Sequence, residues 1–385
     1  MVKGSTDDQE APLLKYGLST ISISSQRSAH VNSIKYIGLD VHTATISVAV
    51  LDAAGKFIME SVVETKASTI LQFMQGLRGD LHVTLEEGTW AGWLYDLLKP
   101  HVTNIVVCDP HRNALLKEGS KSDRIDARKL AELLRAGLLR PVYHGNQGLR
   151  MLQELARAYV TIGKDLNRVM NRVKAIYRSW AIPCHGQSVY APRYREEWLN
   201  KIAHHGVRCR AELYYQQLDG LVLLRKQVRK ELLVEGKRHK AWKLLRSIPT
   251  LGPMRVAVLM AIIQTPHRFR TKRMLWKYSG FGVVTHTSAD HRYVQGRMER
   301  SNKPVFVRGL DTNHNHQLKD LFKSAATQAS TSTGPFREFY EALLAQGMRE
   351  EMARLTLARK IAVITLTIWK KGVAFDANYL KSQTA

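Results

Sequence analysis

The chain has 385 residues, and 58 Lys and Arg residues against 33 Asp and Glu residues give it a net charge of +25. A hydrophobic content of 44% is sufficient for buried cores, which excludes a chain that is disordered throughout. The three cysteines form no CxxC pair and have no His residue at finger spacing, which argues against structural zinc and against a disulfide framework.

The excess positive charge lies in one part of the chain. Residues 34–140 contain 13 basic and 13 acidic residues, whereas residues 141–385 contain 42 basic and 17 acidic residues. An excess of basic residues of this size usually binds a polyanion, most often nucleic acid. A soluble protein with a solvated basic surface is the alternative. The chain shows no signal peptide, and its apolar run at Ile361–Trp369 is too short to span a bilayer. We therefore expect a cytoplasmic, nucleoid-associated protein without a membrane partner.

Residues 34–145 are predicted to form an α/β domain that follows a flexible polar tail at residues 1–33. Short apolar runs predict five strands, at residues 35–40, 46–52, 57–64, 82–86 and 104–109, with helices at 67–78 and 90–98. Three consecutive strands followed by alternating helix and strand predict a ribonuclease H-like (RuvC-like) fold. Ser120 or Ser122 is expected to cap the helix that follows, DRIDARKLAELLR.

Two further regions are predicted to be mainly helical. Residues 146–240 place apolar residues at helical spacing in two long segments, which predicts a coiled-coil arm that serves as a spacer or joins subunits. Residues 241–385 are predicted to form a mainly α-helical domain with a loop-rich stretch at 280–316. Within this domain, IPTLGPMRVA (248–257) predicts a helix-hairpin-helix, whose turn exposes backbone N–H groups to DNA phosphates. An ordinary corner between two helices is the alternative.

Four carboxylates are predicted to converge at one edge of the α/β domain. Asp40 ends the first predicted strand and Glu86 the fourth, and functional groups collect at strand ends of an open sheet. Asp123 and Asp126 are three residues apart, on one face of the next helix. Such a set can hold two Mg²⁺ ions, which prefer oxygen ligands and stabilise the attacking and leaving oxygens in phosphoryl transfer. Glu87 is the alternative to Glu86, which we prefer because it continues the strand directly.

Three segments in this order and spacing resemble the DEDD transposases related to the Piv DNA invertase, some of which are bridge-RNA-guided recombinases: YIGLDVHTATISVAVLD, LEEGTWAGWLYDLL and KSDRIDARKLAELLR. The resemblance covers roughly residues 34–375. It implies that Asp40, Glu86, Asp123 and Asp126 bind Mg²⁺. It also implies that donor and target DNA and a noncoding guide RNA are the partners, and that the protein is a dimer or tetramer. The family often has E-A-T-G where this chain has EEGT, which leaves Glu87 open as the ligand.

The same resemblance implies a serine transposase domain with a nucleophilic serine. GFGVVTHTSADHRY (280–293) places Ser288 at the serine position, although Val283 replaces a proline of the family pattern and Ala289 stands where glycine is common. A serine hydroxyl needs a base or a metal ion nearby to become an effective nucleophile. Thr287 and Ser279 are the alternatives to Ser288.

The residues that we predict to contact nucleic acid are basic positions on the helices and the glycine of the tight turn: Arg124, Arg172, Lys174, Arg246, Gly252, Arg255, Lys272 and Arg273. Together these features predict a DNA transposase/recombinase that cuts and rejoins the strands of a mobile element with two Mg²⁺ ions and a serine nucleophile, guided by a noncoding RNA. Two alternatives stay open. One is a junction-resolving, metal-dependent nuclease in which Ser288 is idle, and the other is a nucleic-acid-binding protein that has lost catalysis.

Overall fold

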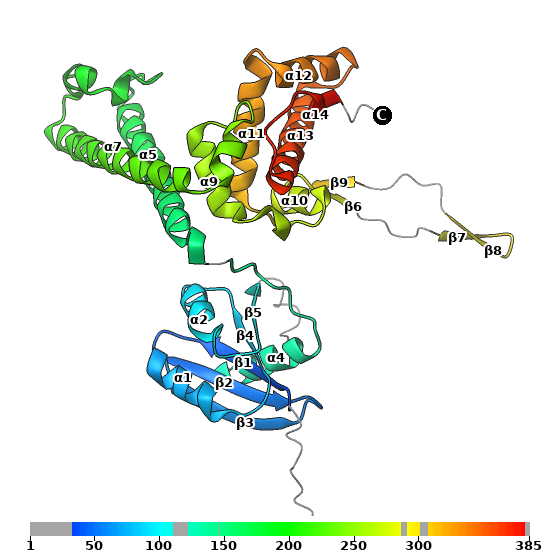
Figure 1. The fold of residues 1–385 in the computed structure, drawn as a ribbon. Helices are drawn as coiled ribbons and strands as arrows, with labels where there is room; N and C mark the ends of the chain where they lie inside the picture. Colours follow the sequence, from blue (N-terminus) through cyan, green and yellow to red (C-terminus); the bar gives the residue numbers. More distant parts are fainter. Residues whose placement is uncertain (1–32, 111–121, 146, 286–290, 301–306, 382–385) are drawn as a thin grey trace, which may run out of the picture. The chain divides into compact units, whose positions relative to one another are not determined.

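The computed structural model describes residues 33–110, 122–145, 147–285, 291–300 and 307–381 (Figure 1). The chain divides into two compact units, residues 1–144 and residues 145–385, and each is described by itself. Within the described ranges, none of the helices combines the length and the apolar character that crossing a membrane requires.

The N-terminal unit is a five-stranded mixed sheet with helices on both faces, which confirms the predicted α/β architecture and is consistent with a ribonuclease H-like fold. Its strands are β1 (Lys35–Val41), β2 (Thr45–Asp52), β3 (Phe57–Glu64), β4 (Leu81–Glu86) and β5 (Asn104–Cys108), in the spatial order β3-β2-β1-β4-β5. Its helices are α1 (Ala67–Gly76), α2 (Ala91–Leu98) and α4 (Asp123–Arg135). β1, β2 and β3 pair antiparallel, whereas β4 pairs parallel with both β1 and β5. The parallel pairing brings the C-terminal ends of β1 and β4 to the same edge of the sheet.

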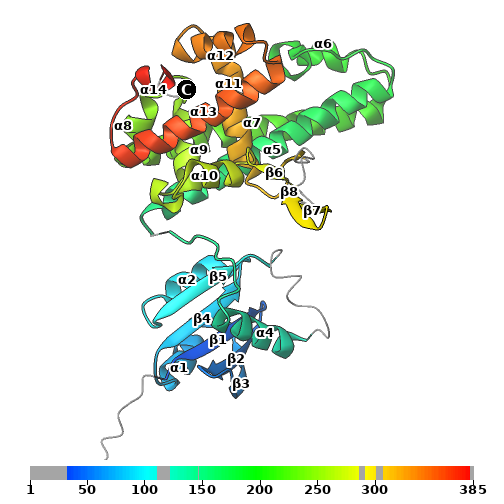
Figure 2. The same cartoon turned by 90° about the vertical axis from the view of Figure 1, so that its right-hand side faces the viewer.

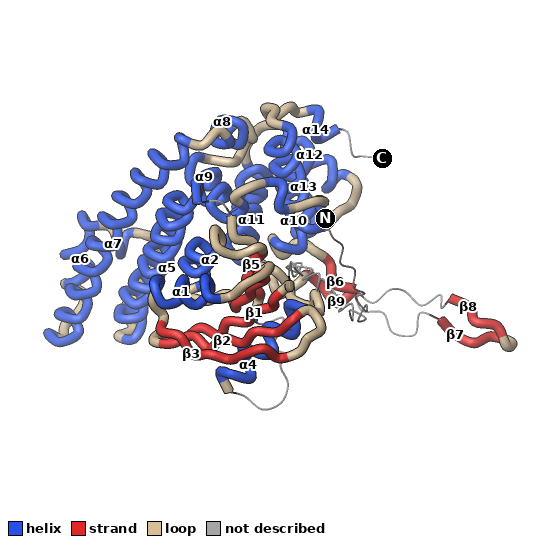
Figure 3. The backbone as a smooth tube through the Cα atoms, turned by 60° about the horizontal axis from the view of Figure 1, so that its bottom comes forward, coloured by secondary structure: helices blue, strands red, loops and turns tan. Residues whose placement is uncertain are grey.

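Alternation of side chains along β1 separates the two layers of this unit. Ile37 and Leu39 are buried in the core that α1 and α2 cover, whereas Gly38 points to the opposite face, against α4. A Cβ atom at Gly38 would lie 2.0 Å from the carbonyl oxygen of Ala127. Figure 3 shows α1 and α2 on one side of the sheet and α4 on the other. The absence of a side chain at Gly38 therefore permits the close approach of α4 to β1.

The first turn of α4 carries the charges that the sequence led us to expect there. Ser122 is its N-cap, and the Ser122 Oγ accepts a hydrogen bond from the backbone N–H of Ile125 at 3.3 Å, which confirms one of the two predicted caps. Asp123 and Asp126 both lie in this turn. Carboxylates near a helix N-terminus interact favourably with the helix dipole, so both stabilise α4 where it meets the sheet.

The C-terminal unit starts with two long helices, α5 (Arg150–Ser179) and α7 (His205–Arg238), which lie side by side (Figure 1). They run antiparallel. Tyr177, near the end of α5, hydrogen-bonds to Tyr215, near the start of α7, whereas Leu152 and Leu232 share a core at the other end of the pair. The short elements η2 (Gln147–Leu149), η3 (Ser188–Tyr190), η4 (Pro192–Tyr194) and α6 (Arg195–Leu199) precede or connect them. The two predicted long helices are thus present, while their role as a coiled coil between subunits stays a prediction.

The remaining elements confirm a helical C-terminal region. Its helices are α8 (Ala241–Arg246), α9 (Pro253–Ile263), η5 (Pro266–Arg268), α10 (Lys272–Tyr278), α11 (His316–Thr331), α12 (Pro335–Ala345), α13 (Glu350–Lys371) and α14 (Asn378–Lys381). Figure 2 shows α9, α11 and α13 packed together. The stretch expected to be loop also holds two short antiparallel pairs, β6 (Val283–Thr285) with β9 (Val307–Leu310) and β7 (His291–Val294) with β8 (Arg297–Arg300). Strands of three or four residues are too short for an alternating pattern to reveal them.

The long helices and the C-terminal helices share one hydrophobic core. Leu152 and Ala156 of α5 and Leu232 of α7 are buried together with Leu259 of α9 and Phe322 of α11. The ends of α5 and α7 that carry these residues would expose apolar surface if they were not packed on α9. The packing is therefore continuous across the domain boundary that the sequence suggested at residue 240.

Candidate functional site

Asp40 and Asp123 meet because α4 lies across β1. Ala127 of α4 contacts β1 at Gly38. Asp40 is two residues further along the strand and points to the same face, and Asp123 is about one turn closer to the helix N-terminus than Ala127. The close helix–strand contact therefore places the first turn of α4 over the C-terminal end of β1.

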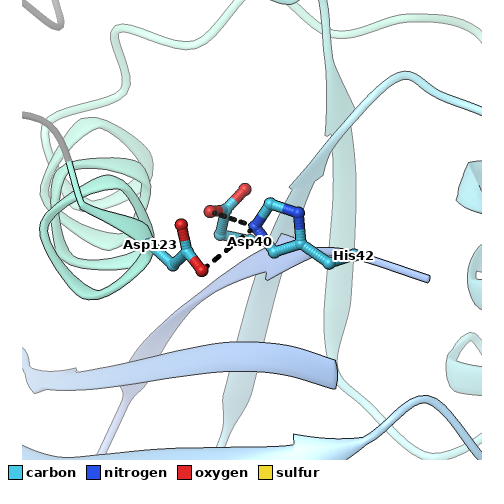
Figure 4. Close-up of side chains that lie close together, drawn as sticks. All are labelled: Asp40, His42 and Asp123. Carbon is cyan, nitrogen blue, oxygen red and sulfur yellow. Dashed lines mark hydrogen bonds and ion pairs between the residues drawn. The ribbon is translucent and has the colours of Figure 1, made fainter. Parts of the chain in front are cut away.

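His42 joins these two carboxylates, as Figure 4 shows. Its Nε2 atom lies 3.1 Å from Oδ2 of Asp40 and 3.5 Å from Oδ2 of Asp123. One ligand atom from each of the three residues lies within 4.8 Å of the others. The side chain of Asp40 is 20% exposed and that of Asp123 63% exposed, so the site is open to solvent on the helix side. His42 is not among the site residues predicted from the sequence, although its spacing of two from Asp40 puts both side chains on one side of an extended segment.

Glu86, the last residue of β4, and Asp126, in the first turn of α4, lie outside this group. Leu39 pairs with Leu85 in the parallel β1–β4 ladder, so Asp40 and Glu86 come next on neighbouring strands and face the same way. Asp126 follows Asp123 by three residues, which keeps it on the face of α4 that contacts the sheet. Within the part of the chain that the structure describes, the three-residue group does not include either of them. The structure thus brings Asp40 and Asp123 together. Glu86 lies on the strand next to that of Asp40, and Asp126 lies in the same helical turn as Asp123.

Glu87 has a partner of a different kind. Its Oε2 atom lies 2.7 Å from Nε2 of His144, whose ring packs against that of Tyr95 with the centroids 5.0 Å apart. Glu87 follows β4 directly, and Tyr95, the ring partner of His144, belongs to α2, which covers the face of the sheet opposite α4. This contact ties the end of β4 to the last residue of the N-terminal unit, and it favours Glu86 over Glu87 as the acid next to Asp40.

The chemistry of the site suits a divalent cation. Two carboxylates at this separation repel each other unless a positive group lies between them. Carboxylate oxygens are ligands for hard divalent cations, and the imidazole nitrogen of His42 is a ligand for transition-metal ions. The exposed side of Asp123 leaves space for phosphate oxygens. The residues present therefore fit a bound divalent metal ion.

The predicted tight turn lies between α8 and α9 and is braced by two arginines. Nη1 of Arg246 donates a hydrogen bond to the carbonyl oxygen of Leu251 at 2.6 Å, and Nη1 of Arg255 donates one to the carbonyl oxygen of Thr250 at 2.8 Å. Burial lowers the pKa of the Arg255 guanidinium. Gly252 is the N-cap of α9. Both guanidinium groups thus brace the turn, and Arg246 remains exposed beside it.

The other residues predicted to contact nucleic acid are mostly exposed. Arg124 follows Asp123 in the first turn of α4, so a cation stands beside the carboxylates. Arg172, Lys272 and Arg273 are also exposed, whereas Lys174 is half-buried, with its Nζ 5.1 Å from the ring centroid of Tyr190. Except for Lys174, these side chains are accessible to a polyanion.

The predicted nucleophile, Ser288, lies outside the described residues, as does Thr287. The third candidate, Ser279, is fully buried, and its Oγ donates a hydrogen bond to the carbonyl oxygen of Leu275 at 2.7 Å. A DNA phosphate has no access to such a hydroxyl. The segment that leads to Ser288 starts from a tightly packed point, because Gly280 has a φ of +70° and a Cβ there would lie 2.5 Å from the ring of His314.

Two family models match the chain. Residues 37–179 match a DEDD transposase domain of the IS110 type, and residues 242–341 match the transposase family IS116/IS110/IS902. The first match contains all four predicted acids and the second contains Ser288. No curated protein matches the chain. The protein therefore carries two transposase domains of the IS110 type, which support a DNA transposase or recombinase.

Proposed function

We propose that the protein is a DNA transposase/recombinase that cuts and rejoins the strands of a mobile element. The observation that carries this proposal is the meeting of Asp40 and Asp123 at the end of β1, inside a segment that matches a DEDD transposase domain. In this proposal Glu86 and Asp126 complete the acidic set, which holds two Mg²⁺ ions. When bound, such ions neutralise charge on the phosphate oxygens during phosphoryl transfer.

Ser288 is the nucleophile in this proposal. Its oxygen forms a bond to phosphorus while the bond from phosphorus to one strand-end oxygen breaks. The proton that the serine loses is matched by the proton that the released strand-end hydroxyl gains. The phosphoserine bond conserves the energy of the cut strand, so attack by the hydroxyl of another strand end reverses the step and joins the two strands.

The charge of residues 141–385 supports binding of both DNA and RNA. Their 42 basic and 17 acidic residues, with Arg172, Lys272 and Arg273 exposed, suit a long polyanion. A noncoding guide RNA is part of the proposal on the basis of the family resemblance. Omission of the RNA should abolish site-specific cutting while leaving salt-sensitive DNA binding in place.

One face of α7 supports the proposed dimer or tetramer. Positions that alternate by four and three residues are exposed along this helix and contain no Lys or Arg: Leu213, Gln217, Gly220, Leu224, Gln227, Glu231 and Val234. The apolar residues among them, Leu213, Leu224 and Val234, are exposed side chains that a second helix could cover. We expect Leu224→Glu to reduce the molecular mass measured by light scattering. Val222→Glu, at an exposed position on the other side of α7, is the matched control.

A covalent adduct tests the proposed chemistry. Protein incubated with the DNA of its element, the guide RNA and Mg²⁺ should form a protease-sensitive protein–DNA adduct that is absent in Ser288→Ala. Thr287→Ala is the matched control and should retain the adduct. If Ser288→Ala still joins strands, another group is the nucleophile.

The same assay separates the two alternatives. A junction-resolving nuclease would cut DNA with Ser288→Ala but not with Asp123→Asn. A binding protein without catalysis would bind DNA and show no metal-dependent cutting in any variant.

A further inference from the structure

We propose that His42 is a ligand of the same divalent cation as Asp40 and Asp123, and that it shifts the preference of the site from Mg²⁺ towards Mn²⁺. The inference rests on the proposed function, because it concerns the metal ion that the acids would hold. The four predicted acids offer oxygen atoms only. His42 adds a nitrogen donor, which the three-residue group brings into direct reach of both carboxylates.

The backbone of His42 is held in a defined place. It follows β1 directly, and its N–H donates a hydrogen bond to the carbonyl oxygen of Thr45 at 2.9 Å. Its own carbonyl oxygen accepts a hydrogen bond from Oγ1 of Thr65 at 2.9 Å. These two bonds link the β1–β2 turn to the residues after β3. The imidazole therefore starts from a rigid turn rather than from a freely moving loop.

The separations between donor atoms fit one ion. Neighbouring ligands of an octahedral ion at about 2.1 Å lie roughly 3.0 Å apart, and opposite ligands about 4.2 Å apart. Nε2 of His42 lies 3.1 Å from Asp40 Oδ2 and 3.5 Å from Asp123 Oδ2, and the whole group is within 4.8 Å. Small side-chain rotations would therefore bring all three donors onto one ion. Because 48% of the His42 side chain and 63% of the Asp123 side chain are exposed, both are able to make such rotations.

A nitrogen ligand changes which ion the site prefers. Mg²⁺ takes oxygen ligands almost exclusively, whereas imidazole binds the first-row transition ions well. Loss of one ligand should weaken Mn²⁺ binding by roughly tenfold or more, on the scale seen for residues that support metal sites. Loss of a nitrogen donor should change Mg²⁺ binding by less than about threefold, since Mg²⁺ readily takes a water in its place.

A second role for His42 predicts the opposite result. If the imidazole only bonds to Asp40 and Asp123 and does not bind the metal ion, it competes with that ion for the two carboxylates. Its removal would then leave the affinity for both ions unchanged or increase it.

The experiment is a Mn²⁺ titration of the full chain without nucleic acid at one fixed pH, followed by electron paramagnetic resonance, with Mg²⁺ as competitor. Wild-type protein should show coupling of Mn²⁺ to a directly bound nitrogen nucleus in pulsed spectra. His42→Ala should lose that coupling and bind Mn²⁺ about tenfold more weakly, and His42→Asp should restore binding with a preference for Mg²⁺. His101→Ala is the matched control. His101 precedes β5 and so lies at the N-terminal ends of the parallel strands, whereas Asp40 and His42 lie at the C-terminal end of β1.

The outcomes separate this inference from the proposed function. If Asp123→Asn abolishes metal binding while His42→Ala changes neither affinity nor nitrogen coupling, the inference is wrong and the metal site stands. If Asp123→Asn has no effect on the binding of either ion, the proposed metal site itself is wrong.

Discussion

The contact between Gly38 and α4 gives the sharpest prediction about how this fold positions its site. In Gly38→Ala, the new Cβ would lie 2.0 Å from the carbonyl oxygen of Ala127, whereas ordinary contacts start at 3.4 Å. The two nearest atoms, the oxygen of Ala127 and the nitrogen of Ala131, both belong to the backbone of α4 and not to a flexible side chain. The backbone of α4 must therefore move away from β1 by about 1.4 Å. The first turn of α4 moves with it, which separates Asp123 from Asp40.

Two effects of different size should follow from this displacement. Overpacking of this kind costs about 1–3 kcal/mol in the free energy of unfolding. A misplacement of roughly 1 Å in a catalytic site lowers the rate by about 100-fold. We therefore expect Gly38→Ala to fold with moderately reduced stability and to lose most of its metal-dependent DNA cutting.

The assay combines DNA cutting with hydrogen–deuterium exchange of β1 and α4 in the full chain. Gly76→Ala is the matched control, because a Cβ at this helical glycine meets nothing within 4 Å. That variant should keep wild-type activity and change the free energy of unfolding by less than about 1 kcal/mol, because Gly76 is the last residue of α1. Wild-type cutting together with unchanged exchange in Gly38→Ala would refute the reasoning, since α4 would then not depend on the missing side chain.

Three further predictions concern other parts of the molecule. Glu86→Gln should lower metal-dependent cutting about 100-fold, whereas Glu87→Gln should change it only a few-fold, because Glu87 contacts His144 instead of the acidic group; equal losses in the cutting assay would contradict this assignment. Burial raises the pKa of Tyr177 and, more strongly, that of Tyr215, so the folded state keeps their protons when the unfolded state loses them. The contribution of this pair to the free energy of unfolding is complete below pH 10 and falls as the pH rises further. In urea unfolding experiments, Tyr215→Phe should make the free energy of unfolding less dependent on pH above 10. The same variant should lower that free energy by about 1–2 kcal/mol at neutral pH. Arg172→Ala should weaken DNA and RNA binding without changing sequence preference and reduce the salt slope of the affinity by about one, measured by fluorescence anisotropy.

The strands and helices of the N-terminal unit could be read from local patterns. KYIGLD and TISVAVLD are short apolar runs because β1 and β2 are buried on both faces of the sheet, and this burial leaves a direct trace in the sequence. The cap at Ser122 and the spacing of Asp123 and Asp126 are likewise local features. The short strands β6 to β9 left no such trace, because they are too brief to establish a period.

The composition of the candidate site depended on contacts that no local pattern contains. His42 was not predicted because it belongs to the site through the approach of Asp123, which is distant in the chain. The proposed choice of Glu86 over Glu87 rests on the pairing of Leu39 with Leu85 and on the contact between Glu87 and His144. Both depend on residues that are distant in the chain.

Packing also gives two basic residues of the C-terminal unit contacts that the sequence does not indicate. The sequence marks Arg246 and Arg255 as basic residues beside a turn, and this would suit a phosphate contact. In the structure both guanidinium groups donate to backbone carbonyls of that turn, and Arg255 is partly buried. A buried donor is satisfied by the nearest acceptor, and only the folded chain determines which acceptor that is.

The sequence by itself determined the α/β class of the N-terminal unit, the helical character of the rest and the separation of charge along the chain, and it predicted the four acidic residues. These properties depend on local periodicity, on composition and on short motifs. The tertiary structure alone decided that Asp40, His42 and Asp123 lie close together, that Glu87 contacts His144, and that the long helices share a core with the C-terminal helices. The physical reason is that side-chain direction and close approach depend on strand register and on the space left by residues such as Gly38, which are set by contacts between distant segments.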